Sequence, residues 1–594
     1  MTEKYLPDHH RLFCGIAIGL FAVFFFVVMF SQLPAEEPQG VPPLRVIYFT
    51  PKDREAPEGR HERLGHVLKH IQDFYRKEME SHGYGPMTFA LEWDEPGNLK
   101  IYDVVGKNNI YDYPNGTEWQ VREEVRENLL RDHEIDIDKE YVLICGAFVE
   151  WKEDFVLEHG PRVSGIGDFA CGCAWVNDDF HVEPDLLSST EPGGFSPILG
   201  PCTIGKYNSF CIGTIAHELG HCFGYPHDCE WNSQREERGV SLMGVGNYHY
   251  YEELRGEGPG TFLTDAAALL FSNTRAFNPK FDDLIKEVVS KSVHFHFDRL
   301  EASTEDGKLI IDGHFEINIP ILGVIVYNDN LAIPDDYDAK SWVAKLEPSG
   351  DFHCEIGELE RVLYRLRLKF IFPGGTLDLG VNYSNLNGTP TLEPINTFIA
   401  AFIIRQLLDQ KEYDKAEDIL KDLAKTYPDN NQWARKLKHL ETVKLPPELL
   451  DPATVDETQT RFDLTYAKAL EEKVGWYEPS RGILRDLGFM EVGSMFFEFG
   501  IFAHADSCYA FSLDKKWKEF EFAYGIQDPH PGSVVFVIRG DGKELFRSRI
   551  IRPDELHFGQ INVSGVERLE LITEDGGNSN ANDWGLWIRP TLLR

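Results

Sequence analysis

The residues best suited to chemistry in this sequence lie between His217 and Asp228, which read HELGHCFGYPHD. His217 and His221 are four residues apart, so on a helix both imidazoles lie on one face, one turn from each other. Two imidazoles at this spacing can bind one Zn²⁺. Glu218 follows the first histidine, and its carboxylate can reach a water molecule beside the metal. The stretch therefore predicts a zinc site with an acid–base residue next to it.

The end of the same stretch predicts a third ligand. Gly224 can end a helix in a left-handed turn at low cost, and Pro226 prevents the helix from resuming. The chain then reverses and can bring His227 back toward the first two histidines. Three protein ligands leave a fourth position open to water, which is typical of a catalytic zinc site. The alternative, a core helix with hydrogen-bonded histidines, leaves the glutamate and the three histidines without a role.

The pattern HExxHxxGxxHD, followed by Met243 in Ser241–Gly244, resembles the metzincin metallopeptidases. In metzincins a long zinc motif is followed by a turn whose methionine lies beneath the metal. The aspartate after the third histidine is most similar to the adamalysin (reprolysin) pattern. The resemblance covers only about residues 205–250. It implies one Zn²⁺ per chain, with His217, His221 and His227 as ligands, Glu218 as general base and Met243 as support.

The composition limits the classes of protein to which the chain can belong. Its 594 residues are too many for one hydrophobic core and predict several domains. The formal net charge of −38 argues against a nucleic-acid partner, because phosphate binding needs a basic surface.

The N-terminal segment Leu12–Phe30 is apolar and carries no charge. It is long enough to cross a bilayer. Lys4 and Arg11 precede it, and basic residues stay on the cytoplasmic side. We therefore expect a transmembrane helix, contact with the membrane through residues 12–30, and a catalytic domain outside the cytoplasm. A cleaved signal peptide, which would make the protein secreted, is the alternative.

Six of the ten cysteines fall between Cys171 and Cys229, around the zinc motif. In an exported domain, this crowding favours disulfides that brace the active-site helix. A second metal site is the alternative. Cys145, Cys354 and Cys508 are isolated in the sequence and are predicted to be buried free thiols.

The first part of the chain predicts an anchor and stalk at residues 1–44 and a metzincin-like α/β catalytic domain at residues 45–290. Strand and helix signals alternate through this domain. Strands are expected at Val46–Phe49, Met87–Trp93, Ile101–Val105 and Tyr141–Phe148, and helices at Arg60–Ser81, Glu118–Leu130 and Leu263–Phe277. The metzincin resemblance further implies an edge strand near residues 168–177, where extended substrate would pair by β-augmentation.

The remaining chain divides into three further parts. Residues 291–395 show short alternating runs separated by Gly, Asp and Pro, which predict a β-sandwich. Residues 396–455 predict a short helical hairpin and linker that resemble one tetratricopeptide-type unit. Residues 456–594 return to strand signals.

The last segment, with FGIFAHADSCYAFSL, FEFAYGI and NDWGLWIRP, resembles the NPCBM family of carbohydrate-binding modules. The resemblance implies a galactose-binding-like β-sandwich that docks on sugar. A sugar site needs an aromatic face and planar polar groups. The candidates are Trp584, Trp587, Asp575, Asp583 and His504, although core and turn positions fit the same residues.

Together these patterns predict a multidomain α+β protein that acts as a zinc-dependent endopeptidase outside the cytoplasm. Its substrate would be a protein, peptide or glycoprotein, with a carbohydrate ligand at the C-terminal module. Two alternatives stay open. The chain is a glycan-binding surface adhesin with an inactive peptidase-like domain, or it is a zinc hydrolase of a glycan-linked amide.

Overall fold

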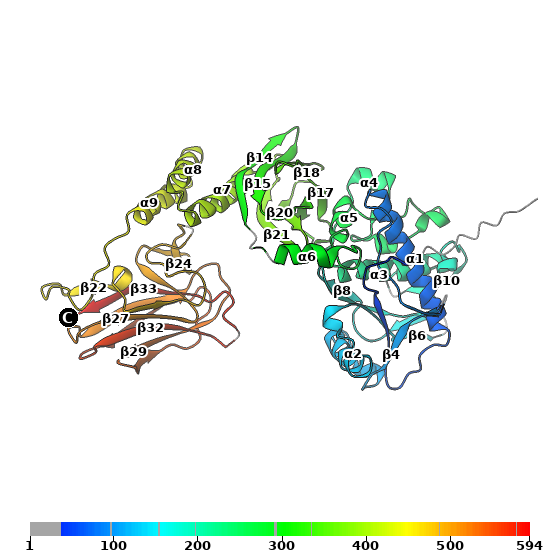
Figure 1. Ribbon diagram of the computed structural model, residues 1–594, viewed down its shortest axis with the longest axis horizontal. Helices are drawn as coiled ribbons and strands as arrows, with labels where there is room; N and C mark the ends of the chain where they lie inside the picture. The colour runs from blue at the N-terminus through cyan, green and yellow to red at the C-terminus, as the bar shows by residue number, and fades with distance from the viewer. Residues whose placement is uncertain are drawn as a thin grey trace, which may run out of the picture.

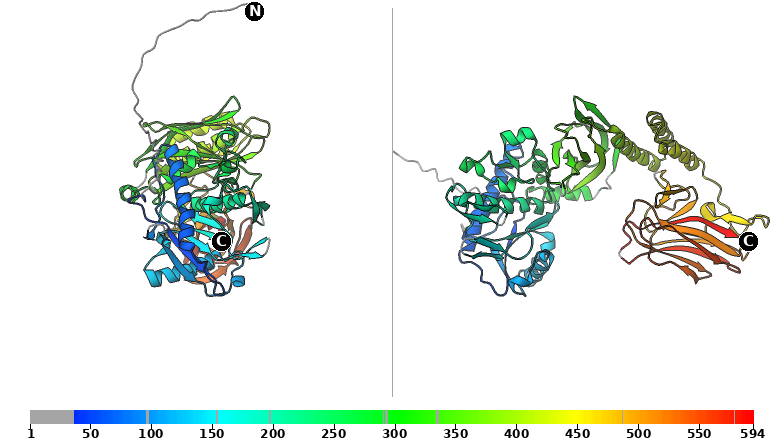
Figure 2. Two further views of the ribbon diagram at one scale, coloured as in Figure 1. Left: turned by 90° about the vertical axis from the view of Figure 1, so that its right-hand side faces the viewer. Right: turned by 180° about the vertical axis from the view of Figure 1, so that it is seen from behind.

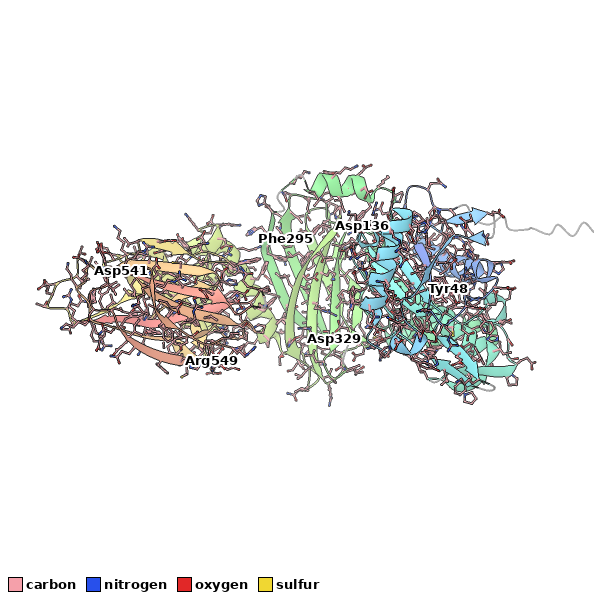
Figure 3. All side chains as sticks on the ribbon, turned by 90° about the horizontal axis from the view of Figure 1, so that it is seen from below. Tyr48, Asp136, Phe295, Asp329, Asp541 and Arg549 are labelled. Carbon is pink, nitrogen blue, oxygen red and sulfur yellow. The ribbon has the colours of Figure 1, made fainter. Side chains whose placement is uncertain are left out.

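The computed structural model shows a multidomain chain of β-sheets and helices (Figure 1). It describes residues 37–594 apart from 96–97, 153–154, 197, 290, 292–293, 334–335, 486 and 578. The first domain, a middle β-sandwich, a group of helices and a C-terminal β-sandwich follow one another in space as they do in the sequence (Figures 1 and 2). Side chains fill each part (Figure 3), with Tyr48 in the first domain, Phe295 in the middle sandwich and Asp541 in the C-terminal one.

The expectation of a transmembrane helix is corrected. Within the residues that the structure describes, no helix combines the length and the apolar character that crossing a membrane requires. The predicted segment Leu12–Phe30 lies outside those residues.

The first domain is built on a five-stranded sheet with helices on both faces. The strand order is β4 (Ile101–Val105), β1 (Arg45–Thr50), β5 (Tyr141–Gly146), β9 (Gly172–Asn177) and β8 (Ser164–Gly167). The first four strands are parallel, and β8 pairs with β9 in the antiparallel direction. Helices α1 (Arg60–Ser81) and α3 (Ile204–Cys222) cover one face, and α2 (Glu118–His133) covers the other.

Shorter elements complete this domain. They are β2 (Trp93–Glu95), β3 (Asn98–Leu99), β6 (Val149–Lys152), β7 (Phe155–Glu158), β10 (Pro192–Ser196), β11 (Gly200–Thr203), α4 (Asn232–Glu237), β12 (Val240–Ser241), β13 (Thr261–Phe262), α5 (Asp265–Phe271) and α6 (Phe281–Val289).

Helix α1 shows why the main elements were predictable. Its apolar residues recur every three or four positions, and Leu64, Ile71 and Tyr75 are all buried against the sheet or α3. The Tyr75 hydroxyl donates a hydrogen bond of 2.8 Å to the carbonyl oxygen of Ala216, directly before the histidine motif. The core of the domain therefore fixes the position of α3.

Three predicted elements of this domain were wrong in extent or place. The strand expected at Met87–Trp93 is irregular, because the hydroxyl of Thr88 and the carbonyl of Phe89 bond to Gln72 of α1 instead of to a strand. The helix expected at Leu263–Phe277 is the shorter α5, which Thr264 caps by accepting a bond from the amide of Ala267. The expected edge strand forms β9 inside the sheet, and the edge belongs to β8.

Two glycines allow the sheet to approach the end of α3. A Cβ atom on Gly172 would lie 1.9 Å from the carbonyl oxygen of Cys222, and one on Gly167 would lie 1.8 Å from the same atom. Any side chain at either position must push the strand away from the helix that carries the histidines.

Gly172→Ala is therefore expected to lower the free energy of unfolding of this domain by about 1–3 kcal/mol, as overpacking does. Calorimetry of the full chain would detect the lower transition temperature. Gly357→Ala is the matched control, because a Cβ there meets no atom within 4 Å. Equal melting of the two variants would contradict the close approach.

The middle β-sandwich has two four-stranded sheets, as its alternating sequence predicted. The first contains β14 (Phe295–Glu305), β15 (Lys308–Ile317), β19 (Asp351–Ile356) and β18 (Lys345–Leu346), and the second contains β17 (Lys340–Val343), β16 (Gly323–Asn330), β20 (Leu363–Phe372) and β21 (Gly375–Ser384). The second sheet packs on the first domain, where Ile325, Tyr327 and Ile371 join its core.

Three helices follow instead of the predicted hairpin: α7 (Leu392–Asp409), α8 (Tyr413–Thr426) and α9 (Gln432–Lys444). The third helix was missed because Asp429–Asn431 reads as a terminating turn, yet Trp433 and Leu440 of α9 are buried against α8.

The C-terminal module is the predicted β-sandwich. One sheet has the order β22 (Arg461–Asp463), β33 (Trp584–Leu593), β28 (Glu519–Ile526) and β31 (His557–Asn562), with β26 (Gly500–His504) also paired to β33. The other has the order β23 (Glu471–Lys473), β27 (Ser507–Ser512), β32 (Arg568–Asp575), β29 (Val534–Gly540) and β30 (Lys543–Arg547). A hairpin of β24 (Met490–Val492) and β25 (Met495–Phe497) reaches α9, where Arg435 lies over the ring of Phe496.

Candidate metal and catalytic site

Helix α3 presents the first two histidines side by side. Thr203 caps the helix by accepting a bond from the amide of Lys206, and the helix runs through the histidine motif to Cys222. The Nε2 atoms of His217 and His221 lie 3.1 Å apart. The helical spacing thus brings the two imidazoles to one point, as the sequence predicted.

The turn after α3 returns the third histidine. Gly224 has a φ of 85°, the left-handed conformation that glycine adopts without strain. The Nε2 atom of His227 then lies 3.0 Å from that of His221. One ligand atom from each of the three histidines lies within 4.8 Å of the others, and this is the metal-competent group found among the described residues.

The hydrogen bonds of the rings fix which nitrogen faces this point. The Nδ1 atom of His217 lies 2.6 Å from the carbonyl oxygen of Leu242, and that of His221 lies 2.7 Å from the carbonyl oxygen of Tyr225. A carbonyl only accepts, so both Nδ1 atoms carry the proton and both Nε2 atoms present a lone pair. Tetrahedral zinc with Zn–N bonds of about 2.0–2.1 Å separates its nitrogen ligands by roughly 3.3 Å, close to the observed spacing.

Both rings are neutral at neutral pH, as metal ligands must be. Burial lowers the pKa of His217 to about 4 and that of His221 to about 3. Converging lone pairs without a cation would repel one another, so the arrangement fits a bound divalent metal.

Met243 lies directly against the helix between the two ligands. Its side chain is fully buried, and a Cβ on Gly220 would come within 2.2 Å of its sulfur. The carbonyl of Met243 accepts a bond from the amide of Asp228, while the preceding carbonyl accepts from His217. The turn at Met243 therefore contacts both ends of the histidine motif through its backbone carbonyls.

Asp228 is a fully buried carboxylate surrounded by hydroxyl groups. Its oxygens accept hydrogen bonds from Tyr225 at 2.7 Å, Ser241 at 3.0 Å, Thr264 at 2.6 Å and Ser341 at 2.7 Å. The first three belong to the first domain, and Ser341 lies on β17 of the middle sandwich. The residue that follows the third histidine therefore ties that histidine to two domains.

Asp228→Ala is expected to lower the free energy of unfolding by more than about 2 kcal/mol, because it leaves four buried hydroxyls without their acceptor. Ser341→Ala removes one donor and should cost only about 0.5–1.5 kcal/mol. Thermal denaturation of the full chain checks both. Equal stability of Asp228→Ala and the parent protein would contradict the arrangement.

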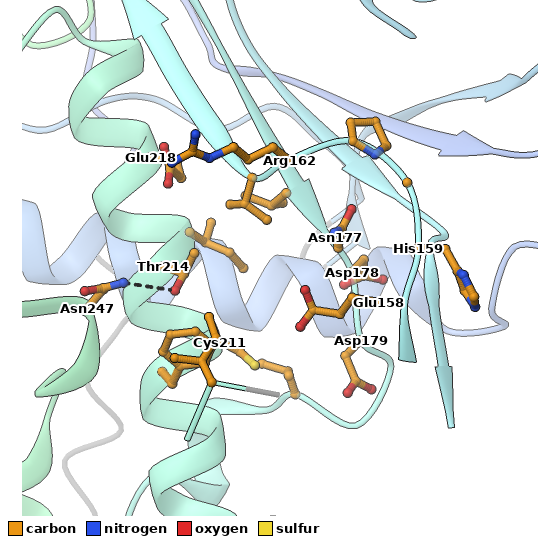
Figure 4. Close-up of a pocket in the computed structure, with 18 of the residues that line it drawn as sticks. Glu158, His159, Arg162, Asn177, Asp178, Asp179, Cys211, Thr214, Glu218 and Asn247 are labelled. Atoms are coloured by element: carbon orange, nitrogen blue, oxygen red, sulfur yellow. Dashed lines mark hydrogen bonds between the residues drawn. The ribbon is translucent and has the colours of Figure 1, made fainter. Parts of the chain in front are cut away.

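Glu218 lines a cavity of about 430 Å³, with Arg162 and Thr214 also on its walls (Figure 4). Burial raises the pKa of Glu218 to about 7, and Arg162 on the opposite wall acts in the other direction. Thr214 of the same helix face bonds to Asn247 at 3.4 Å, and Tyr248 and Tyr337 also line the cavity. Glu218 thus points into a space large enough for a substrate side chain.

The segment directly before the edge strand β8 lines this cavity through Arg162 and Val163. A Cβ on Gly165 would lie 2.2 Å from the carbonyl oxygen of Glu218, so β8 runs directly beside the helix at the candidate base. Within the described sheet β8 pairs only with β9, and its outer side is available for a further strand. The edge strand is thus present one strand away from its predicted place.

The predicted disulfides are corrected. All nine cysteines that the structure describes are free thiols. Cys222 is buried at the end of α3, and its sulfur contacts the carbonyl of Val142. The predicted free thiols at Cys145 and Cys354 are confirmed as buried, whereas Cys508 is partly exposed. Small side chains therefore pack around α3, and no disulfide links the cysteines that the structure describes.

The five sugar-binding candidates of the C-terminal module do not form one site. Trp584 lines a cavity of about 330 Å³ and stacks on His530 with ring centroids 3.8 Å apart. His504 lies nearby, 6.4 Å from Trp584 between centroids, but is buried. Trp587 is fully buried in the sandwich core and offers no face to a ligand.

The two acidic candidates of the module hold its backbone. Asp583 is buried and accepts a bond from the amide of Ser533, and Asp575 accepts one from the amide of Gly577. Of the five candidates, Trp584 alone lines the cavity described above. His530, which stacks on it, was missed because it lies in a loop without a sequence pattern.

Two residues that line the cavity of Glu218 were also missed. Arg162 lies in the segment before β8, and Tyr337 lies in the loop before β17, far from the motif in sequence. No local spacing links either residue to the histidines, so only the fold could place them there.

Comparisons with known proteins identify one part of the chain directly. Residues 462–593 match the NPCBM/NEW2 domain, which confirms the resemblance of the C-terminal module. A disintegrin and metalloproteinase with thrombospondin motifs 18 from Mus musculus is 33% identical over 132 residues, which cover 20% of this chain. The match spans 9% of the length of that curated relative.

Two solved structures are similar in part. OgpA from Akkermansia muciniphila, solved as a catalytically inactive form with an O-glycopeptide (glycodrosocin) substrate, has a TM-score of 0.49 and 23% identity and covers 60% of this chain and 96% of its own. The CBM51 module of GH95 from Clostridium perfringens, solved with methyl-galactose, has a TM-score of 0.22 and 21% identity and covers 23% of this chain and all of its own.

Proposed function

We propose that this protein is a metzincin-type, zinc-dependent endopeptidase that acts outside the cytoplasm on proteins or glycoproteins. The observation that carries the proposal is the convergence of the Nε2 atoms of His217, His221 and His227, next in the chain to Glu218, which lines a cavity. Three neutral imidazoles with an open fourth position are the ligand set of a catalytic zinc site.

The chain's own residues divide the work of peptide hydrolysis. When bound, zinc would supply a Lewis acid that polarises the scissile carbonyl and lowers the pKa of a water molecule. The Glu218 carboxylate accepts the proton of the attacking water and delivers it to the nitrogen of the leaving amine. The carbonyls of Leu242 and Tyr225 keep the proton on Nδ1 of the two helical histidines, and so keep both rings turned toward the site.

The edge of β8 is the proposed binding place for the peptide backbone. An extended peptide can add to an exposed strand through main-chain hydrogen bonds, and its alternate side chains then enter neighbouring pockets. Because Gly165 lies against the backbone of Glu218, such a peptide would run beside the helix that carries the proton acceptor. The cavity lined by Thr214, Asn247 and Tyr248 would hold one side chain of the substrate, with any sugar attached to it.

The C-terminal module is proposed to hold the substrate's glycan and not to cleave it. Trp584 supplies the aromatic surface of its cavity, where α7 and α9 also contribute Arg405 and Lys436. A module that binds glycans meets them on secreted proteins and cell surfaces, which supports a location outside the cytoplasm. The proposed domain limits are 45–290, 291–395, 396–455 and 456–594.

Trp584→Ala is expected to weaken binding of the module to its glycan by about 1–3 kcal/mol, the contribution of one aromatic ring at the centre of a binding site. Binding of the full chain to a glycan array measures the loss. Trp476→Ala is the matched control, because Trp476 is 59% exposed and lies outside the cavity. Unchanged binding by Trp584→Ala would move the sugar site elsewhere.

The test of the proposed function is mass spectrometry of products from a mixed pool of peptides and mucin-type glycoproteins. The parent protein should release new peptide termini, and a zinc chelator should stop the release. Retention of glycans without any cleavage would favour the adhesin alternative. Release of glycans from intact peptides would favour the glycan-linked amide hydrolase. Either result would overturn the endopeptidase.

A further inference from the structure

The loop before β17 reaches from the middle sandwich to the histidine site. The ring of Tyr337 stacks on the ring of His227 with a centroid distance of 3.7 Å and an interplanar angle of 26°. It is also nearly parallel to His217, at 6.5 Å between centroids. The contact of His227 with Tyr337 is shorter than its contacts with His217, at 5.4 Å, and with His221, at 4.5 Å.

The backbone beside this contact is fixed by pairing between the two domains. The amide of Cys229 donates a hydrogen bond of 2.7 Å to the carbonyl of Ala339, and Cys229 forms a parallel bridge with Lys340. Two residues further, the indole nitrogen of Trp231 donates to the carbonyl of Ser341 at 3.0 Å. The chain that follows His227 thus runs alongside the chain that follows Tyr337.

The same strip is anchored by side chains on both sides. The hydroxyl of Ser341 donates to Asp228, directly after the third histidine. Trp231 stacks on Trp342 at 5.5 Å, with an interplanar angle of 20°. Because Ile325 and Tyr327 also join the core of the first domain, this interface is apolar at its centre and does not behave as a loose hinge.

Tyr337 further separates two cavities. It lines the cavity that contains Glu218 and also a second cavity of about 300 Å³ between the domains, which Asn328, Asp338 and Trp342 border. Its side chain is 38% exposed, so it is not a core residue of the sandwich. Tyr337 is exposed and lies against a candidate metal ligand. This position indicates a role at the metal site and not a role in stabilising the middle sandwich.

We propose that the middle sandwich is part of the active site, and that Tyr337 is a positioning residue that holds the ring of His227 toward the metal. His217 and His221 each lie against a carbonyl of the first domain, and the aromatic face of Tyr337 adds a contact to His227 from the second. The inference rests on the proposed zinc site. It extends that site across a domain boundary that the sequence suggested would separate catalysis from a structural module.

The test compares zinc binding by three variants of the full chain. Metal is removed, and Zn²⁺ is added back in competition with a chromophoric chelator. Loss of a group that orients a metal ligand costs about 10- to 100-fold in affinity. Tyr337→Ala should therefore weaken zinc binding by that factor, while Tyr337→Phe, which keeps the ring, should bind as the parent does. Val343→Ala, 39% exposed on β17, the strand that follows the loop of Tyr337, is the matched control and should change nothing.

A second readout reports ligand geometry directly. The visible absorption of the Co²⁺-substituted protein depends on the arrangement of the three imidazoles, so Tyr337→Ala should shift it and Tyr337→Phe should not. Parent-like affinity and spectrum in Tyr337→Ala would overturn the proposal, as would equal losses in Tyr337→Phe and Tyr337→Ala. If Tyr337→Ala does not fold, Tyr337→Leu keeps the apolar volume without the ring and takes its place.

These measurements separate this proposal from the proposed function. Zinc affinity and the Co²⁺ spectrum need no substrate, so they test Tyr337 even if the parent protein cleaves no peptide. A parent protein that binds zinc tightly, responds to Tyr337→Ala and hydrolyses nothing would refute the endopeptidase and retain the two-domain metal site.

Discussion

Replacing Glu218 with glutamine is expected to reduce kcat/KM for peptide hydrolysis by about 10²- to 10⁴-fold, the contribution of a positioned proton acceptor. Glutamine has nearly the same shape as glutamate but cannot take a proton from water at neutral pH. Glu218 points into the cavity and is not one of the three converging ligands, so zinc content should stay at one per chain. Product formation and metal content, measured on the same preparation, check both parts.

The control for this result is Glu253→Gln, on a carboxylate outside the cavity of Glu218. It should leave turnover and zinc content as in the parent protein. Full activity in Glu218→Gln would remove this residue from the mechanism. A loss of zinc together with activity would show that Glu218 acts on the metal site and not on the proton.

Removing the metal is expected to abolish peptide hydrolysis, the second of the two largest effects. His221→Ala should have the same result. The Nε2 atom of His221 lies 3.1 Å from that of His217 and 3.0 Å from that of His227, so it is the middle member of the three. Its loss leaves two nitrogen ligands and breaks the site. Peptide hydrolysis by this variant should fall to the level of the chelated parent protein.

Titration with zinc distinguishes the chelated parent protein from the His221→Ala variant. The chelated parent protein should regain activity when Zn²⁺ is restored, whereas His221→Ala should not respond at equal concentrations. His249→Ala, on a histidine outside the triad, should bind zinc and cleave as the parent does. Activity of the parent protein that survives complete removal of metal would exclude a zinc mechanism.

The parts of the site that sequence could predict are those set by local geometry. Four-residue spacing fixes the first two histidines on a helix, and the left-handed turn at Gly224 returns the third. Periodicity was equally sufficient for α1, because buried residues recur from Arg63 to Met79 of this 22-residue helix. Both features depend on residues that are close together in the sequence. The sequence could therefore predict them, and the structure agrees.

The parts that sequence missed depend on contacts between distant segments. Arg162 and Tyr337 reach the site through the sheet edge and through the middle sandwich, and neither carries a pattern that points there. The edge strand was assigned to β9 because β8, with two glycines in four residues, lacks a strand signal. Cysteine crowding suggested disulfides, yet these thiols occupy small positions in a packed core.

The helices between the two β-sandwiches have a consequence for how the protein would engage a long substrate. Leu487 of the C-terminal module is buried among α7, α8 and α9, and Arg485 pairs with Asp409 of α7 at 2.7 Å. The module therefore packs against these helices through Leu487 and Arg485. A glycan held there would present only chain segments at one set spacing to the histidines. The effective concentration of those segments would rise, and that of segments at any other spacing would fall toward zero. The protein would then cleave its substrate at a set distance from the glycan that the C-terminal module holds.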